Sequence, residues 1–162
     1  MAALKIDMSK AYDRIEWDFF RSGKTRFDDR WIELIMLCVT IVHYNVIREG
    51  TTVGPIVPSR GLRQEDPLSP YLFILCAEGL SSLLRKNERA GFIHGAKVAR
   101  GAPMVSHLFF IDDWFLFFNA NQREASLIKH MLAEYGAASG QVVNFNKSLV
   151  SFSANVSEID AR

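Results

Sequence analysis

The spacing of apolar and polar residues divides the chain into short strands and amphipathic helices. Residues 2–6 are mostly apolar and predict a strand that ends at Asp7. A turn at residues 8–10 follows. Apolar positions from Tyr12 to Phe20 then recur with helical spacing until Gly23 breaks the pattern. The chain therefore opens with a predicted strand, turn and helix.

A second helix is predicted for residues 28–42, where apolar side chains cover most of the helix surface. Two runs rich in β-branched residues, 44–48 and 53–57, come next and are separated by a short polar segment that contains Gly50. This pattern predicts a β-hairpin.

Residues 58–69 predict an irregular loop, because prolines and glycines interrupt every period there. A long helix should begin with Ser69 as its N-cap and Pro70 in its first turn. We expect it to continue through a series of leucines to Lys86 and to be closed by Gly91.

The last third of the chain alternates strands and one helix. Residues 92–99 predict a strand, and residues 122–137 predict a helix with Asn121 as its N-cap and Gly140 near its end. Residues 142–152 predict a final hairpin that turns around residues 144–147.

This mixture of hairpins and helices predicts an α+β fold, in which an antiparallel sheet carries helices on one face. The chain has 162 residues, of which 49% are hydrophobic and 23% charged. That is enough to bury one core, and no linker or internal repeat interrupts the sequence. We therefore expect a single domain over residues 1–162.

Two adjacent carboxylates, Asp112 and Asp113, separate two apolar, aromatic-rich runs that begin at His107 and end at Phe118. The runs predict two buried strands, so the carboxylates fall where a hairpin turns. Aspartate favours turns, which is one sufficient explanation. The other is that a cation or hydrogen-bond donors compensate two like charges beside so much apolar surface.

Composition limits the classes of function. The formal net charge of +1 gives no global basic field of the kind that a free-standing nucleic-acid-binding protein usually carries. Cys38 and Cys76 lie in apolar helical patterns without metal-ligand spacing, which indicates buried free thiols in a reducing, intracellular compartment. Residues 31–47 are too polar for a membrane span, and no secretory signal opens the chain.

Three further positions have both a structural and a chemical explanation. Asp7 either caps the following turn or projects a carboxylate from the sheet edge. Residues 63–67 form either a solvated loop or an anion site at a helix N-terminus. Lys147 lies in a predicted tight turn, where an exposed lysine is the default.

Taken together, these positions fall in four blocks that resemble the reverse transcriptase of plant non-LTR (LINE-type) retrotransposons over nearly the whole chain. The blocks stand in the family's order and match its polymerase motifs A to D: residues 5–17 (KIDMSKAYDRIEW), 58–73 (PSRGLRQEDPLSPYLF), 110–113 (FIDD) and 138–148 (ASGQVVNFNKS). The long motif B block in register with the other three makes this resemblance specific.

The resemblance implies a polymerase palm that transfers nucleotides onto a primer 3′-hydroxyl, as directed by an RNA template. Asp7, Asp112 and Asp113 would hold two Mg²⁺ ions, with Mn²⁺ as a possible substitute, since such ions prefer carboxylate and phosphate oxygens.

Further residues are assigned by the same resemblance. Tyr12 would pack under the sugar of the incoming deoxynucleoside triphosphate and exclude a 2′-hydroxyl, and Arg63 and Gln64 would bind the nucleotide. Lys147 would donate a proton to the leaving pyrophosphate.

Two positions depart from the family pattern. Glu65 stands where the family has glycine, adding a side chain and a negative charge near the expected triphosphate. Ile111 replaces a smaller residue before the aspartate pair.

Architecture departs from the family as well. The resemblance places most of the fingers ahead of this chain and the thumb after it, with residues 28–60 contributing to the fingers side. We therefore expect weak or no activity from the isolated chain.

Two other functions are compatible with the sequence. One is a non-catalytic relic of a retrotransposon that binds nucleic acid or a protein. The other is a magnesium-dependent phosphodiesterase, which would explain the carboxylates but leaves the motif B block unexplained.

Overall fold

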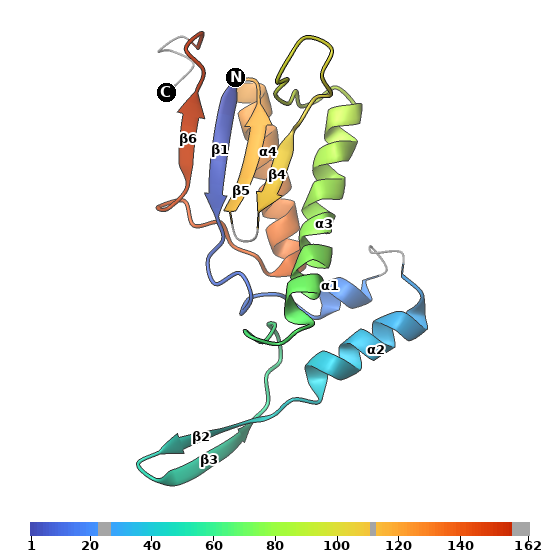
Figure 1. The fold of residues 1–162 in the computed structure, drawn as a ribbon, viewed down its shortest axis with the longest axis vertical. Helices are drawn as coiled ribbons and strands as arrows, with labels where there is room; N and C mark the ends of the chain where they lie inside the picture. The colour runs from blue at the N-terminus through green and yellow to red at the C-terminus, as the bar shows by residue number, and fades with distance from the viewer. Residues whose placement is uncertain (23–26, 111–112, 157–162) are drawn as a thin grey trace.

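The computed structural model describes residues 1–22, 27–110 and 113–156, and its main feature is an antiparallel sheet with strand order β4-β5-β1-β6. The strands are β1 (Ala2–Asp7), β4 (His107–Phe110), β5 (Asp113–Phe118) and β6 (Leu149–Phe152). Two long helices, α3 (Ser69–Arg89) and α4 (Gln122–Ser139), pack against this sheet (Figure 1). The predicted α+β fold is confirmed.

The core lies between the helices and one face of the sheet. Side chains alternate between the two faces of a strand, and Ile6, Trp114 and Leu116 are completely buried on the helical side. They pack with Leu80 of α3 and Met131 of α4, which are also buried. The intervening residues of β1 and β5 therefore point to the other face, which we call the open face.

The remaining elements lie at one end of the molecule. They are α1 (Asp18–Arg21), α2 (Asp29–Thr40), β2 (Tyr44–Arg48) and β3 (Thr51–Ile56). The predicted hairpin is present as the antiparallel pair β2–β3, which extends away from the sheet and is exposed along its whole length (Figure 1). No helix in the described part of the chain is long and apolar enough to cross a membrane.

Helix α4 is bounded as predicted. The Asn121 side chain accepts a hydrogen bond from the backbone N–H of Glu124, and Gly140 ends the helix at φ 77°. Helix α3 differs at its start, because its N-cap is Leu68 and not Ser69. Asp66 satisfies the first turn instead, with its Oδ1 accepting from the Leu68 N–H at 2.8 Å.

The helix predicted around residues 12–20 is wrong except for the four residues of α1. Residues 9–14 form turns whose backbone groups bond to distant segments. The N–H of Ser9 donates to the Val142 carbonyl, and the N–H of Glu16 donates to the Ser139 carbonyl, both at 2.9 Å. A continuous helix would pair the Glu16 N–H with the Tyr12 carbonyl, but the first donates to Ser139 and the second accepts from Leu62.

The strand predicted for residues 92–99 is also wrong, since only an isolated bridge joins Ala96 to Val105. Part of the reason is a carboxylate that takes the place of a partner strand. The backbone N–H of His94 donates to Glu124 Oε2 at 3.0 Å, and this buried carboxylate also accepts from the N–H of Asn119.

The predicted final hairpin does not form, although its second strand exists as β6. Val143 bridges Met8 and β6 pairs with β1, so both halves run antiparallel to the first strand. A turn between them, in which Lys147 N–H donates to the Asn144 carbonyl at 3.1 Å, interrupts the pairing. The backbone groups of both halves pair with β1 and Met8 instead of with each other.

Candidate active site

The site begins with two carboxylates that face each other across neighbouring strands. Asp7 ends β1 and Asp113 begins β5, and the two are directly paired in the antiparallel register. Directly opposite residues project to the same face of a sheet. Asp112 lies outside the described residues. The structure therefore brings together two of the three predicted metal-binding carboxylates, at the end of the sheet where β1 ends and β5 begins.

A lysine that the sequence analysis did not single out joins this pair. Lys5 Nζ lies 3.0 Å from Asp113 Oδ2 and 5.8 Å from the centre of the Phe115 ring. Lys5 stands two residues before Asp7, so the alternation of side chains along β1 places it on the same open face. That spacing is the sequence signal that could have identified it.

The turn that carries Lys147 is anchored to Asp7. The backbone N–H of Asn144 donates to the Asp7 carbonyl at 2.9 Å, and the Asp7 N–H donates to Ser148 Oγ at 3.3 Å. Lys147 itself is exposed. The structure thus brings the turn, and with it the predicted proton donor, next to the strand end that bears Asp7.

The loop after β1 and the loop before α3 are joined by three hydrogen bonds that involve their backbones, beside a side-chain contact between Arg60 and Glu16. Trp17 Nε1 donates to the Gly61 carbonyl at 2.7 Å. The N–H of Gly61 donates to the Ile15 carbonyl, and the N–H of Leu62 donates to the Tyr12 carbonyl, both at 2.8 Å. The two blocks that resemble motifs A and B, far apart in sequence, are therefore one structural unit.

The predicted nucleotide-binding residues lie on this unit. Tyr12 stacks on Phe73 of α3 with ring centres 4.9 Å apart and an interplanar angle of 11°. Arg63 forms an ion pair with Asp66, and Gln64 is exposed. Tyr12 is therefore held by packing, whereas Arg63 and Gln64 are presented on an exposed loop.

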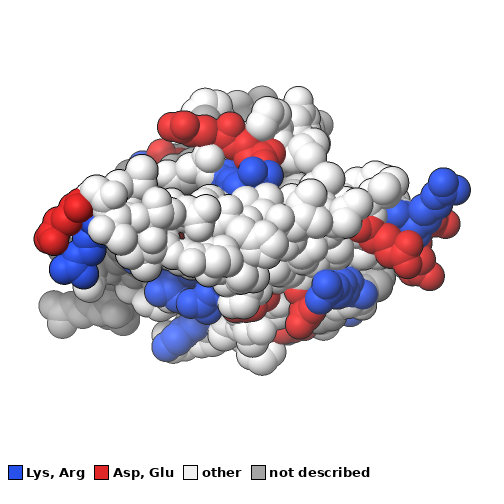
Figure 2. Space-filling view, turned by 90° about the horizontal axis from the view of Figure 1, so that it is seen from below, with Lys and Arg blue, Asp and Glu red and all other residues white. Residues whose placement is uncertain are grey.

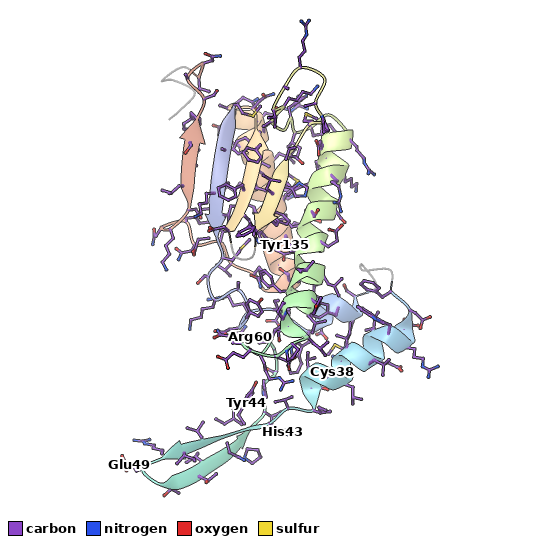
Figure 3. The ribbon with its side chains drawn as sticks, in the orientation of Figure 1. Cys38, His43, Tyr44, Glu49, Arg60 and Tyr135 are labelled. Atoms are coloured by element: carbon purple, nitrogen blue, oxygen red, sulfur yellow. The ribbon has the colours of Figure 1, made fainter. Side chains whose placement is uncertain are left out.

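A cavity of about 190 Å³ opens beside the same loops. Its wall joins residues of the two loops to residues of α2 and β2 (Figure 3). The contributing side chains include Asp13, Trp17, Cys38, Tyr44, Arg60 and Arg63. Arg60 also reaches back to Glu16, with 3.3 Å between Nη1 and Oε1. Polar and apolar side chains both line the cavity, and Arg63, one of the predicted nucleotide-binding residues, is among them.

Glu65 occupies an unusual backbone conformation in this loop. Its φ is 67°, in the left-handed region that glycine adopts without steric penalty and other residues avoid. The resemblance to motif B implies that the family has a glycine at this position, where this chain has Glu65. The structure shows that the loop keeps a glycine-like conformation although the side chain has changed.

The titratable groups whose pKa is clearly shifted lie away from the carboxylate pair. Burial lowers the pKa of His107, which lies between Ser81 Oγ at 2.8 Å and Ser106 Oγ at 3.0 Å, and nearby Arg85 adds to this effect. Burial raises the pKa of the Cys76 thiol to about 11, so the thiol stays protonated. Neither group adjoins the carboxylate pair, and a protonated thiol is not a nucleophile.

Metal-ligating residues are sparse in the part of the chain that is described. No group of three or more histidine, cysteine, aspartate or glutamate side chains there is arranged to hold a metal ion. Because Asp112 is not among the described residues, Asp7 and Asp113 are the two members of the predicted set whose surroundings are known. Both cysteines are free, with Cys76 buried as predicted and Cys38 only partly so.

An antiparallel sheet that carries opposed carboxylates at the adjoining ends of β1 and β5, with two helices behind it, has the architecture of a polymerase palm. Two solved structures have the same fold. They are telomerase from Candida tropicalis, as the apo form truncated from its C-terminal domain and in complex with a fragment of telomeric RNA, with TM-scores of 0.64 and 0.65. They are 17% and 15% identical in sequence, cover 97% and 95% of this chain, and are themselves covered to 31% and 26%.

The profile of the family described as "Reverse transcriptase (RNA-dependent DNA polymerase)" matches residues 2–158. The chain belongs to the reverse transcriptase family, as the four sequence blocks predicted.

Two relatives agree with this assignment. An uncharacterized mitochondrial protein of Arabidopsis thaliana is 52% identical over 67 residues, which are 41% of this chain and 55% of that protein. The Pol polyprotein from the type-1 retrotransposable element R2 of Popillia japonica is 29% identical over 115 residues, 70% of this chain and 18% of the polyprotein. The matched part is therefore only about half of the first relative and under a fifth of the second.

Proposed function

We propose that this chain is the palm of an RNA-directed DNA polymerase, which extends a DNA primer with deoxynucleotides by copying an RNA template. The observation that carries the proposal is the register that sets Asp7 opposite Asp113 on the open face. The docking of the motif B loop on the motif A loop supports it, because the hydrogen bonds between the two loops connect the proposed nucleotide-binding residues to the segment that follows Asp7.

Asp7, Asp112 and Asp113 would hold the two Mg²⁺ or Mn²⁺ ions of such a polymerase. The donor set fits, because carboxylate oxygens are the ligands these ions prefer, and Asp7 and Asp113 project from opposed positions. When bound, the ions activate the primer hydroxyl and stabilise the leaving pyrophosphate.

The other predicted residues would act on the nucleotide. Tyr12, held against Phe73, presents a fixed aromatic edge that excludes a 2′-hydroxyl. Arg63 would exchange its ion pair with Asp66 for a phosphate, and Gln64 would bind the same nucleotide. Lys147, in the turn anchored to Asp7, would give a proton to the leaving pyrophosphate.

Residues 28–60, which comprise α2 and the β2–β3 hairpin, would belong to the fingers side. They extend from the palm next to the motif B loop (Figure 1). The surface seen from the hairpin end in Figure 2 is largely uncharged, with acidic and basic side chains in small mixed groups. Most of the phosphate-binding charge would then come from segments outside this chain, in agreement with the net charge of +1.

Primer extension on an RNA template with Mg²⁺ or Mn²⁺ tests the proposal. Asp113→Asn should abolish extension, whereas Glu33→Gln, a change at an exposed carboxylate of α2, should leave it unchanged. Equal extension by the Asp113→Asn variant and the parent would refute the assignment of Asp113. Extension by neither would refute catalysis by this chain.

The second candidate is a non-catalytic, retrotransposon-derived domain that binds nucleic acid or a protein. Glu65 favours it, because a negative side chain at a strained position stands beside the proposed triphosphate site. RNA or DNA binding that does not depend on a divalent ion, in a chain that fails to extend a primer, would support this candidate.

A further inference from the structure

The carboxylate pair of the proposed metal site already has a cation of the protein's own. The Lys5 ammonium lies 3.0 Å from one oxygen of Asp113, and the side chains of Lys5 and Asp113 are 39% and 48% exposed. Solvent therefore reaches both groups and weakens the attraction between them. A second cation can reach the same carboxylate without unfolding the strand.

The strand register explains why the lysine is there. Lys5 is paired with Phe115 and Asp7 with Asp113, so the lysine reaches diagonally across the sheet to the carboxylate opposite its neighbour. Asp7 and Asp113 bear like charges at opposed positions, an arrangement that destabilises a sheet unless it is compensated. An ammonium group on the same face reduces that repulsion.

Lys5 also has a second favourable position. Its Nζ lies 5.8 Å from the centre of the Phe115 ring, within the range of a cation–π contact. An ammonium group that leaves the carboxylate can stay over this ring on the open face. Displacement of Lys5 from Asp113 therefore requires a side-chain shift and no change in the backbone.

We propose that Lys5 is a positioning residue that takes the place of a divalent cation at Asp113 and is displaced when the metal ion binds. This inference rests on the metal site proposed above and deepens it. Lys5 holds the Asp7–Asp113 edge together in the metal-free protein. Because the ammonium group and the metal ion compete for the same oxygens, Lys5 also lowers the apparent affinity for the ion.

The affinity for Mn²⁺, measured by the EPR signal of the free ion, tests this competition without any need for polymerase activity. Lys5→Met should bind Mn²⁺ about two- to five-fold more tightly than the parent, the range expected when a half-exposed ion pair no longer competes. Lys5→Arg keeps the charge and should bind like the parent. Lys10→Met is the matched control, since it removes an exposed lysine from the loop after β1 and should leave the affinity unchanged.

Asp113→Asn shows whether the measured Mn²⁺ binds at the proposed site, because this substitution should weaken Mn²⁺ binding in both the parent and the Lys5→Met background. The inference is supported if Lys5→Met binds Mn²⁺ more tightly than the parent while Lys5→Arg and Lys10→Met do not. Mn²⁺ binding by Lys5→Met where the parent shows none also supports it. Binding by the parent that Lys5→Met leaves equal or weakens would overturn the inference and leave the metal site standing. Binding by neither protein, or binding that Asp113→Asn does not weaken, would overturn both the inference and the proposed metal site.

Discussion

Trp17 donates its indole N–H to the carbonyl of Gly61 at 2.7 Å, and this bond fastens the loop before α3 to the loop after β1. The Trp17 side chain is only 9% exposed, so the bond is largely shielded from water. Two backbone hydrogen bonds of Gly61 and Leu62 lie next to it. The indole thus fixes the distance between the carboxylate edge of the sheet and the loop that carries the proposed nucleotide-binding residues.

Trp17→Phe should lower the free energy of unfolding by about 1–3 kcal/mol, because it keeps an aromatic ring but leaves the shielded Gly61 carbonyl without this donor. Urea denaturation measures the change. Trp31→Phe in α2 is the control, since Trp31 is 38% exposed, and its loss should be smaller. Equal losses in the two variants would contradict a special role for the indole bond.

Glu65→Gly should raise the free energy of unfolding by up to about 1 kcal/mol. The left-handed conformation at φ 67° costs a residue with a side chain about 1–2 kcal/mol, part of which the larger chain entropy of glycine offsets. Gln64→Gly, one position away, should instead destabilise the protein.

Glu65→Gly should also strengthen the binding of deoxynucleoside triphosphates, measured by calorimetry, because it removes a negative charge near the proposed triphosphate site.

Gly140→Ala should destabilise the protein by about 3 kcal/mol. Gly140 has φ 77°, and an added Cβ would collide with the Arg14 backbone carbonyl in the loop after β1. Gly91→Ala separates the two effects, because Gly91 has φ 72° but its Cβ would meet nothing within 4 Å. That control should lose only about 1–2 kcal/mol, the conformational part, and an equal loss would argue against the collision.

The stability of the fold should fall on acidification through the titration of His107. The pKa of His107 is lowered from its ordinary 6.5, so the unfolded chain binds the proton more readily than the folded one. Stability is therefore fully present above about pH 6.5 and is lost as the pH falls from there towards the lowered pKa. Unfolding free energies between pH 8 and 5 should show this loss, and His107→Gln should flatten it.

His130→Gln, at an exposed histidine of α4, is the control for His107→Gln and should leave the pH dependence unchanged.

A separate loss of stability is expected at lower pH from Glu124. Burial alone would raise the pKa of Glu124, but hydrogen bonds from Asn119 and His94 outweigh it, and the pKa lies below the ordinary 4.5. The stability from Glu124 is thus lost only as the pH falls below about 4.5, in a range distinct from that of His107.

Tyr12→Ala should reduce the preference for deoxynucleotides over ribonucleotides. Stacking on Phe73 holds the ring in one position, and its removal would open space at the proposed position of the sugar. Thermal shifts with paired deoxynucleoside and ribonucleoside triphosphates would measure the preference. Tyr71→Ala, at a 68% exposed tyrosine of α3, should leave it unchanged, and an equal effect of the two substitutions would exclude Tyr12 as the discriminating residue.

Local patterns in the sequence were sufficient wherever one element forms its own bonds. The apolar, aromatic-rich run that ends at Phe118, the Asn121 cap and the polar turn around Gly50 each predicted an observed element. In these places the period of the side chains matches that of the backbone bonds. The Asp7–Asp113 pair was expected only from the resemblance to motifs A and C, and the register sets these two residues opposite each other.

The prediction failed where distant segments provide the partners. The turns of residues 9–14 and the segment 142–152 bond to each other across more than a hundred residues, and no local pattern encodes that pairing. Lys5 was missed for a related reason. It looks like a solvent-facing residue of a strand until the register shows that Asp113 stands diagonally across from it.

The strand order also bears on the kinetics of folding. β1 lies inside the sheet although it comes first in the chain, and its neighbours β5 and β6 come more than a hundred residues later. Pairing over such separations carries a large loop-closure entropy, so the sheet should form after α3 and α4 have become helical. The Asp7–Asp113 edge is thus one of the last features to assemble, and a hydrogen-exchange pulse during refolding should protect the amide of Asp7 later than those in the middle of α4.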